Sequence, residues 1–229
     1  MDFFDINNIF FEIWGYPMSY LEFGATTAGF VFVVLEARAH ILNWPAAILN
    51  AILLFILFYQ VQLYPDMFLQ VFFFLTSIIG WWRWANPKPG EEDIKMELKV
   101  SYMSAGQLIM LAGIGLIGTL LVGTFAKNLH ELFPVLFNKP SAFPYLDSFV
   151  TVMSITTTFF MIQKKIESWI VWMVVDAIGT YMYFVKGVKF LSVQYLAYCF
   201  IASYGLWNWI REFKSYGNRT NKEILDSEA

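Results

Sequence analysis

Amide and carboxylate side chains stand inside long apolar runs of this chain, where they could bind a polar solute. The stretch "NWPAAILN" places Asn43 and Asn50 seven residues apart, on one face of a helix, with Trp44 beside the first of them. Further along, "SWIVWMVVD" starts an apolar run near Trp169 and carries Asp176 within it. An ionisable group in such a run is costly, and by default it marks a functional site.

Asp176 shares its helical face with three aromatic residues, Trp169, Trp172 and Tyr183. A carboxylate beside aromatic rings suits a flat, cationic ligand, because the rings make cation–π contacts while the carboxylate balances the charge. The alternative is an aspartate that hydrogen-bonds a neighbouring helix or stays protonated.

The amide residues permit a similar pair of interpretations. Asparagine offers both a donor and an acceptor, which match a carboxamide or a ribose hydroxyl. Hydrogen bonding between helices is the alternative, since membrane bundles use it routinely. Two more helical stripes mix amides with aromatic residues, and for them ligand binding and packing both stay open: Gln70, Phe74, Ser77 and Trp81 in one, and Gln194, Tyr198, Gly205 and Asn208 in the other.

Composition limits the class of protein. Of the 229 residues 58% are apolar and 14% are charged, against about 25% charge in a soluble domain. The chain is therefore predicted to be an all-α integral membrane protein in the lipid bilayer. The net charge of −3 gives no reason to expect nucleic acid as a partner. Two histidines far apart and a single cysteine favour neither a metal site nor a disulfide framework, and we expect no cofactor.

Seven runs are long enough to span a membrane as helices. They cover 21–37, 44–61, 67–84, 103–126, 146–161, 169–185 and 190–210. We expect residues 1–20 to form a short amphipathic helix at the interface and the polar tail, 211–229, to fray. Asn43, Asp147 and Ser168 are predicted to cap the second, fifth and sixth helices.

The basic residues predict the orientation. With seven spans, four of the 15 Lys and Arg residues lie on the side of the N-terminus and the other eleven on the opposite side. Cytoplasmic loops carry the excess of positive charge, so we expect the N-terminus outside and the C-terminus in the cytoplasm.

An internal repeat has an offset of 125 residues. It pairs Trp44 with Trp169, Gly80 with Gly205, Trp82 with Trp207 and Trp84 with Trp209. We expect two three-helix repeats, 21–84 and 146–210, joined by a linker helix within 85–145. Because the linker crosses the membrane once, both repeats have the same orientation in the membrane. Parallel repeats of this kind are an architecture of transporters, which bind substrate near the midplane between the halves. The paired tryptophans at the helix ends (82, 84, 207 and 209) are expected to form an aromatic belt.

Several segments together resemble the PnuC family of vitamin transporters over roughly residues 20 to 212: "NWPAAILN", "FYQVQLYPDMFLQVFFF", "GWWRW", "LDSFVTVMS", "KKIESWIVW" and "GLWNW". The resemblance implies two three-helix repeats with a linker helix, similar in architecture to the SWEET sugar transporters, and a homotrimer. It also implies facilitated-diffusion uptake of nicotinamide riboside, which a cytoplasmic kinase then traps by phosphorylation. Related members carry thiamine or riboflavin.

The family's motifs map onto nine positions of this chain: Asn43, Trp44, Asn50, Gln70, Trp81, Trp169, Trp172, Asp176 and Asn208. Asp176 departs from the pattern, because some nicotinamide riboside members carry Asn there. Nicotinamide riboside and thiamine are both cationic, so Asp176 does not decide between them.

We expect a passive, multi-pass transporter of a bacterial inner membrane. A membrane enzyme or a receptor is the alternative, although the acidic run at Glu91 to Asp93 is typical of a solvated loop.

Overall fold

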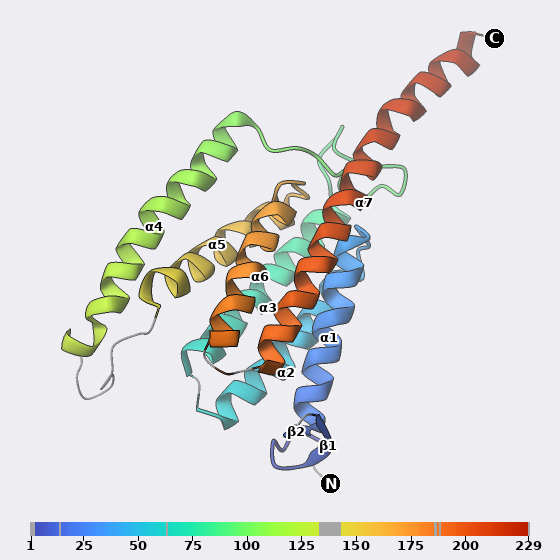
Figure 1. Cartoon of the computed structure of the whole chain (residues 1–229). Coiled ribbons are helices and arrows are strands. Elements are labelled where there is room, and N and C mark those ends of the chain that lie inside the picture. The colour runs from blue at the N-terminus through green and yellow to red at the C-terminus, as the bar shows by residue number, and fades with distance from the viewer. Residues whose placement is uncertain are drawn as a thin grey trace. The chain divides into compact units, whose positions relative to one another are not determined.

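The computed structural model describes residues 3–13, 15–62, 64–132, 143–185, 187 and 189–228, without the side chains of 64–66, 129, 189–190 and 218–228 (Figure 1). The chain divides into two compact units, Met1–Lys99 and Val100–Ala229. The first contains two strands and three helices: β1 (Ile9–Ile13), β2 (Tyr16–Ser19), α1 (Tyr20–Ala37), α2 (Asn43–Gln60) and α3 (Tyr64–Ala85). The second contains four helices: α4 (Ala105–Leu132), α5 (Pro144–Ile162), α6 (Ser168–Val185) and α7 (Lys189–Glu228).

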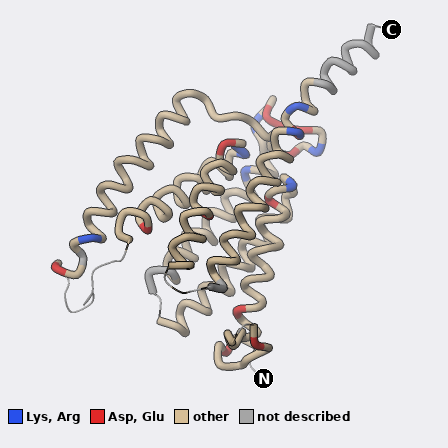
Figure 2. The backbone as a smooth tube through the Cα atoms, in the orientation of Figure 1, with Lys and Arg blue, Asp and Glu red and all other residues tan. Residues whose placement is uncertain are grey.

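The predicted helical membrane fold is confirmed at the level of its helices. Each predicted span falls on one of α1 to α7. Among the described residues, five helices are long and apolar enough to cross a membrane: α1, α2, α5, α6 and residues Ala105–Asn128 of α4. Figure 2 shows long stretches of these helices without charge, with most Lys, Arg, Asp and Glu residues at helix ends and in loops. Hydrocarbon therefore suits the middle of each of these helices.

The N-terminal segment is a β-hairpin, so the predicted amphipathic helix is wrong. β1 pairs antiparallel with β2, and Gly15 in the turn has a φ of +79°, which favours glycine. The Ser19 hydroxyl then accepts from the backbone N–H of Glu22, while the Glu22 carboxylate accepts from the backbone N–H of Ser19. This capping box starts α1 directly after the hairpin.

The side chain of Gln60, at the end of α2, holds the chain ahead of the hairpin. Its Nε2 donates to the carbonyl of Phe4 at 2.5 Å, and its Oε1 accepts from the backbone N–H of Ile6 at 3.0 Å. The Phe3 ring lies against Gly24 of α1, where an added Cβ would come within 3.1 Å of the ring. The N-terminal segment is thus attached to both α1 and α2.

Glycines allow tryptophan rings to enter the helix packing of each unit. In the first unit Trp44 is buried against Gly80, and its ring meets the Trp84 ring edge-on at 5.2 Å between centroids. In the second unit Trp169 packs on Gly205 in the same way, and its ring meets that of Trp209 at 5.4 Å.

The turns between helices also correspond at the offset of 125 residues. After α1, Ala39 has a φ of 51° and its N–H donates to the carbonyl of Glu36 at 2.8 Å. After α5, Lys164 has a φ of 54° and its N–H donates to the carbonyl of Met161 at 2.9 Å. The two turns therefore share an uncommon left-handed residue as well as its hydrogen bond.

The turns after α2 and α6 also share a left-handed residue and its hydrogen bond. Gln62 after α2 has a φ of 59°, and Gly187 after α6 has a φ of 79°. Their N–H groups donate to Tyr59 and to Phe184, at 3.2 and 3.0 Å. Both turns of each three-helix segment thus follow one backbone plan.

Two tryptophans of the predicted aromatic belt are buried instead. Trp84 and Trp209 have no exposed surface, whereas Trp82 is 65% exposed and Trp207 is 54% exposed. Two residues along a helix turn a side chain by about 200°. Hence Trp82 and Trp207 face outward and fit the belt, and their neighbours belong to the tryptophan pairs.

The predicted N-caps are also wrong. α2 begins at Asn43 after the N-cap residue Leu42, and α5 has Phe143 as N-cap, with Asp147 in its first turn. Ser168 is the first residue of α6 and is fully buried. The tail predicted to fray continues α7 as a helix to Glu228.

In the second unit, α4 packs on α5 through small residues. An added Cβ would come within 2.8 Å of Met153 at Gly115 and within 2.8 Å of Val152 at Gly118. At Gly113 nothing lies within 4 Å. One side of α4 therefore approaches α5 closely, and Gly113 lies on another side.

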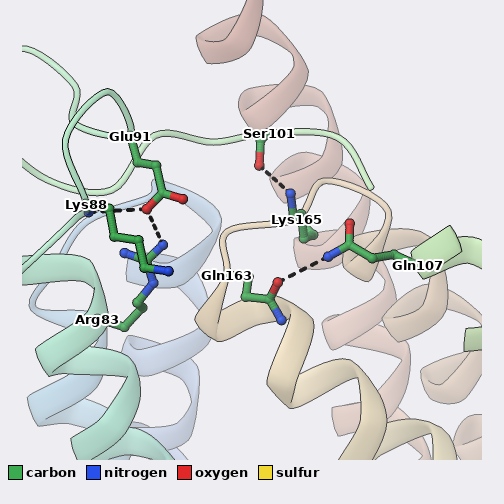
Figure 3. Close-up of polar contacts among 7 residues, drawn as sticks. All are labelled: Arg83, Lys88, Glu91, Ser101, Gln107, Gln163 and Lys165. Carbon is green, nitrogen blue, oxygen red and sulfur yellow. Dashed lines mark hydrogen bonds and ion pairs between the residues drawn. The ribbon is translucent and has the colours of Figure 1, made fainter. Parts of the chain in front are cut away.

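Polar contacts hold the loops at helix ends within each unit (Figure 3). In the first, Arg83 Nη2 lies 2.5 Å from Glu91 Oε2, and this hydrogen bond lowers the pKa of the Glu91 carboxyl. In the second, Lys165 Nζ donates to Ser101 Oγ at 2.9 Å and Gln107 Nε2 donates to Gln163 Oε1 at 3.2 Å. The loop before α4 is thereby tied to the turn between α5 and α6.

Candidate functional site

Asp176 lies buried in α6, on the side that faces α7. Its side chain is 5% exposed, and it is close enough to Tyr195, Tyr198 and Cys199 of α7 to interact electrostatically with each. Within the part of the chain that the structure describes, no hydrogen bond or ion pair reaches its carboxylate. A buried carboxylate in this state lacks a compensating charge, and a cationic ligand would supply one.

Two tyrosines of α7, Tyr195 and Tyr198, lie near this carboxylate, and Tyr183 of α6 packs against the first of them. Gly179, three residues after Asp176, lets the Tyr195 ring approach α6, because an added Cβ would lie 2.4 Å from a ring carbon. The Tyr183 ring stacks obliquely on Tyr195, with 5.2 Å between centroids and 32° between planes. Phenol rings near a carboxylate offer a negative surface to a flat cation.

Gln194 joins the same cluster through Tyr198. Its Nε2 donates to the Tyr198 hydroxyl at 2.9 Å, which orients both side chains on α7. Asp176, Tyr183, Gln194 and Tyr198, four of the predicted site residues, thus lie together in the α6–α7 pair. The sequence interpretation missed Tyr195, which lies between them.

The start of α2 carries a second polar group. Asn43 is fully buried, and its Nδ2 donates to the carbonyl of His40 at 2.8 Å. Among described residues, the Asn43 Oδ1 and the Trp44 Nε1 are both buried without a hydrogen-bond partner. At the start of α6 in the second unit, Ser168 Oγ and Trp169 Nε1 are likewise buried without a hydrogen-bond partner among described residues. Each pair offers one acceptor or hydroxyl and one donor that a polar ligand could use.

Asn50 has a partner of its own. Its Nδ2 donates to the carbonyl of Ala25 in α1 at 2.7 Å. The interaction favours the interhelical role that the sequence left open, since it satisfies the amide inside the α1–α2 pair.

The remaining predicted residues differ in their surroundings. On α3, Gln70 is 7% exposed, Phe74 is half-buried and Trp81 is 41% exposed. On α6, Trp172 packs against an apolar cluster that includes Met153, Phe160 and Val175. Asn208 is half-buried on α7, one residue before the buried Trp209.

Two further buried charged residues lie at helix ends and were absent from the predicted site. Glu36 in the last turn of α1 is 5% exposed, and Lys164 after α5 has no exposed surface. The sequence carried a signal for Glu36, because it falls within the predicted span 21–37.

Comparison with known proteins places this chain in a family. The family model described as nicotinamide mononucleotide transporter matches residues 19–211. The nicotinamide riboside transporter PnuC of Escherichia coli is 31% identical over 96% of this chain and 98% of its own length. The chain belongs to this transporter family. The predicted resemblance is confirmed: the protein is a multi-pass membrane transporter and not an enzyme.

Two other relatives extend the comparison. The riboflavin/roseoflavin transporter RibM of Streptomyces davaonensis is 24% identical over 79% of this chain and 80% of its own length. The crystal structure of the vitamin B3 transporter PnuC has a TM-score of 0.65 at 22% identity, covering 86% of this chain and 83% of that one. At that identity the likeness establishes the fold.

Proposed function

We propose that the protein takes up nicotinamide riboside by facilitated diffusion across a bacterial inner membrane. The support is its similarity to the E. coli nicotinamide riboside transporter over nearly the full length of both chains. The observation within the structure that carries the proposal is the buried Asp176, which has aromatic neighbours and lacks a hydrogen-bond partner among described residues. The pyridinium ring of nicotinamide riboside is flat and cationic, so it fits such a group.

We further propose two parallel three-helix repeats, α1–α3 and α5–α7, with α4 as linker in a SWEET-like architecture. The matching turns and tryptophan–glycine pairs at an offset of 125 residues support it. The N-terminus is outside and the C-terminus cytoplasmic, as the basic residues predict. The working unit is a homotrimer, and a cytoplasmic kinase traps the substrate.

The second candidate is another vitamin. Riboflavin as the substrate is supported by the similarity to RibM, which has lower identity and coverage than the E. coli protein. Thiamine has the charge of its thiazolium ring, which suits Asp176 as well as a pyridinium does. Riboflavin is neutral and gains nothing from the carboxylate, so we place nicotinamide riboside and thiamine ahead of it.

A binding panel on the purified protein distinguishes these ligands. Thermal stability is measured with nicotinamide riboside, thiamine, riboflavin and the phosphorylated form of each, since a ligand that binds the folded state raises the melting temperature. We expect stabilisation by nicotinamide riboside and a much weaker effect of nicotinamide mononucleotide. Equal stabilisation by the phosphorylated form would contradict trapping, and a response to riboflavin alone would reassign the substrate.

A further inference from the structure

A basic hollow lies on α7 where the helix leaves its apolar stretch. Its volume is about 450 Å³, and its lining residues are Trp207, Ile210, Arg211, Lys214 and Ser215. At about 100° per residue these positions fall within one arc of roughly 140° on the helix surface. The hollow therefore belongs to a single face of α7, with apolar side chains toward the membrane span and cations beyond them.

The two cations of this face find no acidic partner among the residues that the structure describes. In the described part of the chain, no ion pair involves Arg211 or Lys214. The nearest acid along the helix, Glu212, accepts a hydrogen bond from the Tyr216 hydroxyl at 3.0 Å. Glu212 and Tyr216 lie roughly opposite the centre of the hollow around the helix. Figure 2 shows basic residues on α7 shortly before its undescribed end. The face thus keeps its positive charge.

The corresponding end of α3 lacks this feature. There the basic residue is Arg83, and it is paired with Glu91 at 2.5 Å. The residues 125 positions before Arg211 and Lys214 are Asn86 and Pro89, which carry no charge. An unpaired basic cluster is therefore specific to the second of the two matching helix ends.

Trp207 adds an interfacial side chain to the cations. It is 54% exposed, and the Arg211 guanidinium lies over its ring at 5.5 Å from the centroid. Tryptophan rings of this kind settle at the level of lipid headgroups, and basic clusters beside them attract anionic lipids. The Ser215 hydroxyl donates to the carbonyl of Glu212 at 2.7 Å, so the two cations supply the donors for a phosphate.

We propose that this hollow binds the headgroup of an anionic phospholipid. The phosphate lies between Arg211 and Lys214, and the acyl chains run along Trp207 and Ile210 toward the bilayer. The proposal does not rest on the identity of the transported vitamin, because none of the lining residues is a candidate substrate contact.

The test titrates detergent-solubilised full-length protein with phosphatidylglycerol or phosphatidylcholine and measures bound lipid by native mass spectrometry. Each basic side chain near an anionic lipid contributes about fivefold in affinity. We expect phosphatidylglycerol to bind more tightly than phosphatidylcholine, and the double variant Arg211→Gln/Lys214→Gln to weaken it by roughly 25-fold. Arg211→Lys/Lys214→Arg keeps both charges and should retain the preference, which separates lost charge from misfolding.

The matched control removes two exposed cations elsewhere, as Lys95→Gln/Lys127→Gln, and leaves the preference unchanged. The proposal is overturned if both double Gln variants lose affinity equally, since net charge alone would then attract the lipid. Unchanged phosphatidylglycerol binding by the Arg211→Gln/Lys214→Gln variant would also overturn it. A third arm adds inorganic phosphate at millimolar concentration. Displacement of the lipid by phosphate alone would make this a site for soluble phosphate instead.

Discussion

Asn50 and Asp176 present the same sequence signal, a polar residue within an apolar helix, yet their surroundings differ. The Asn50 amide is satisfied by the Ala25 carbonyl. The Asp176 carboxylate faces tyrosines and has no such partner among described residues. An amide can complete its hydrogen bonds on a neighbouring backbone, whereas a carboxylate needs donors or a cation. The different hydrogen-bonding needs of the two groups thus favour a packing role for Asn50 and leave Asp176 as the candidate site residue.

Replacing Asp176 by Asn tests the cation contact. The side chain keeps its size and loses its charge, so we expect affinity for nicotinamide riboside to fall about 10- to 100-fold, since a contact with a charged group is worth about 1.5–3 kcal/mol. Isothermal titration of the purified variant measures this affinity, and its melting curve reports on folding.

Asp147→Asn is the matched control, because it makes the same change in the first turn of α5. Its affinity should equal that of the unmodified protein. If the Asp176→Asn variant also bound with full affinity, Asp176 would be a structural residue.

Which site residues could be predicted depends on how far their partners lie along the chain. Asp176 and Tyr183, and likewise Gln194 and Tyr198, could be predicted to share a helix face, because helical periodicity is a property of the local sequence. Tyr195 was missed because only the close approach of α7 to Gly179 brings its ring against α6. A contact between helices depends on packing geometry, which periodicity within one helix does not contain.

At the scale of elements, pairs of tryptophans and glycines build the two three-helix segments. Gly80 and Gly205 leave room for Trp44 and Trp169, and each ring then meets a second tryptophan edge-on. Sequence comparison at the offset of 125 residues predicted that these tryptophans and glycines correspond between the two segments, but not that each ring packs against the glycine. It did not predict that one of the two tryptophans at each helix end is buried, since an aromatic residue there suits both a belt and a core.

Alanine at either glycine should destabilise the protein. An added Cβ would lie 2.2 Å from the Trp44 ring at Gly80 and 2.7 Å from the Trp169 ring at Gly205. Overpacking of this kind costs about 1–3 kcal/mol. We expect both Gly80→Ala and Gly205→Ala to lower the melting temperature measured in detergent.

Gly113→Ala makes the same change on α4, where nothing lies within 4 Å. Alanine favours a helix over glycine by about 0.5–1 kcal/mol, so this control should melt at an equal or higher temperature. Equal stability of all three variants would show that the tryptophan rings can move aside at no cost.

The N-terminal hairpin shows why one element was predicted wrongly. Phe3, Ile6, Phe10 and Ile13 have helical spacing, but the backbone reverses at Gly15 and pairs β1 with β2. Short segments with many aromatic residues fit either period. Long-range bonds from Gln60 to Phe4 and Ile6 then support the observed path, and they could not be predicted from local sequence.

At the scale of the whole molecule, composition and hydropathy predicted a helical membrane protein, and segment order predicted its family. Both are confirmed, because spans and motifs are local properties that need no knowledge of packing. The identity of the transported vitamin, in contrast, is not a local property of the sequence. It depends on which side chains contact the ligand, and this chain is similar both to a relative named for nicotinamide riboside and to one named for riboflavin.

Counterflow in kinase-free proteoliposomes tests facilitated uptake of nicotinamide riboside most directly. Vesicles loaded with unlabelled nicotinamide riboside are diluted into labelled substrate, without a proton gradient and with an uncoupler present. A passive carrier accumulates label transiently, and an excess of unlabelled nicotinamide riboside abolishes the signal, whereas riboflavin does not. Accumulation that requires a proton gradient would contradict facilitated diffusion, and accumulation of labelled riboflavin but not nicotinamide riboside would contradict the proposed substrate.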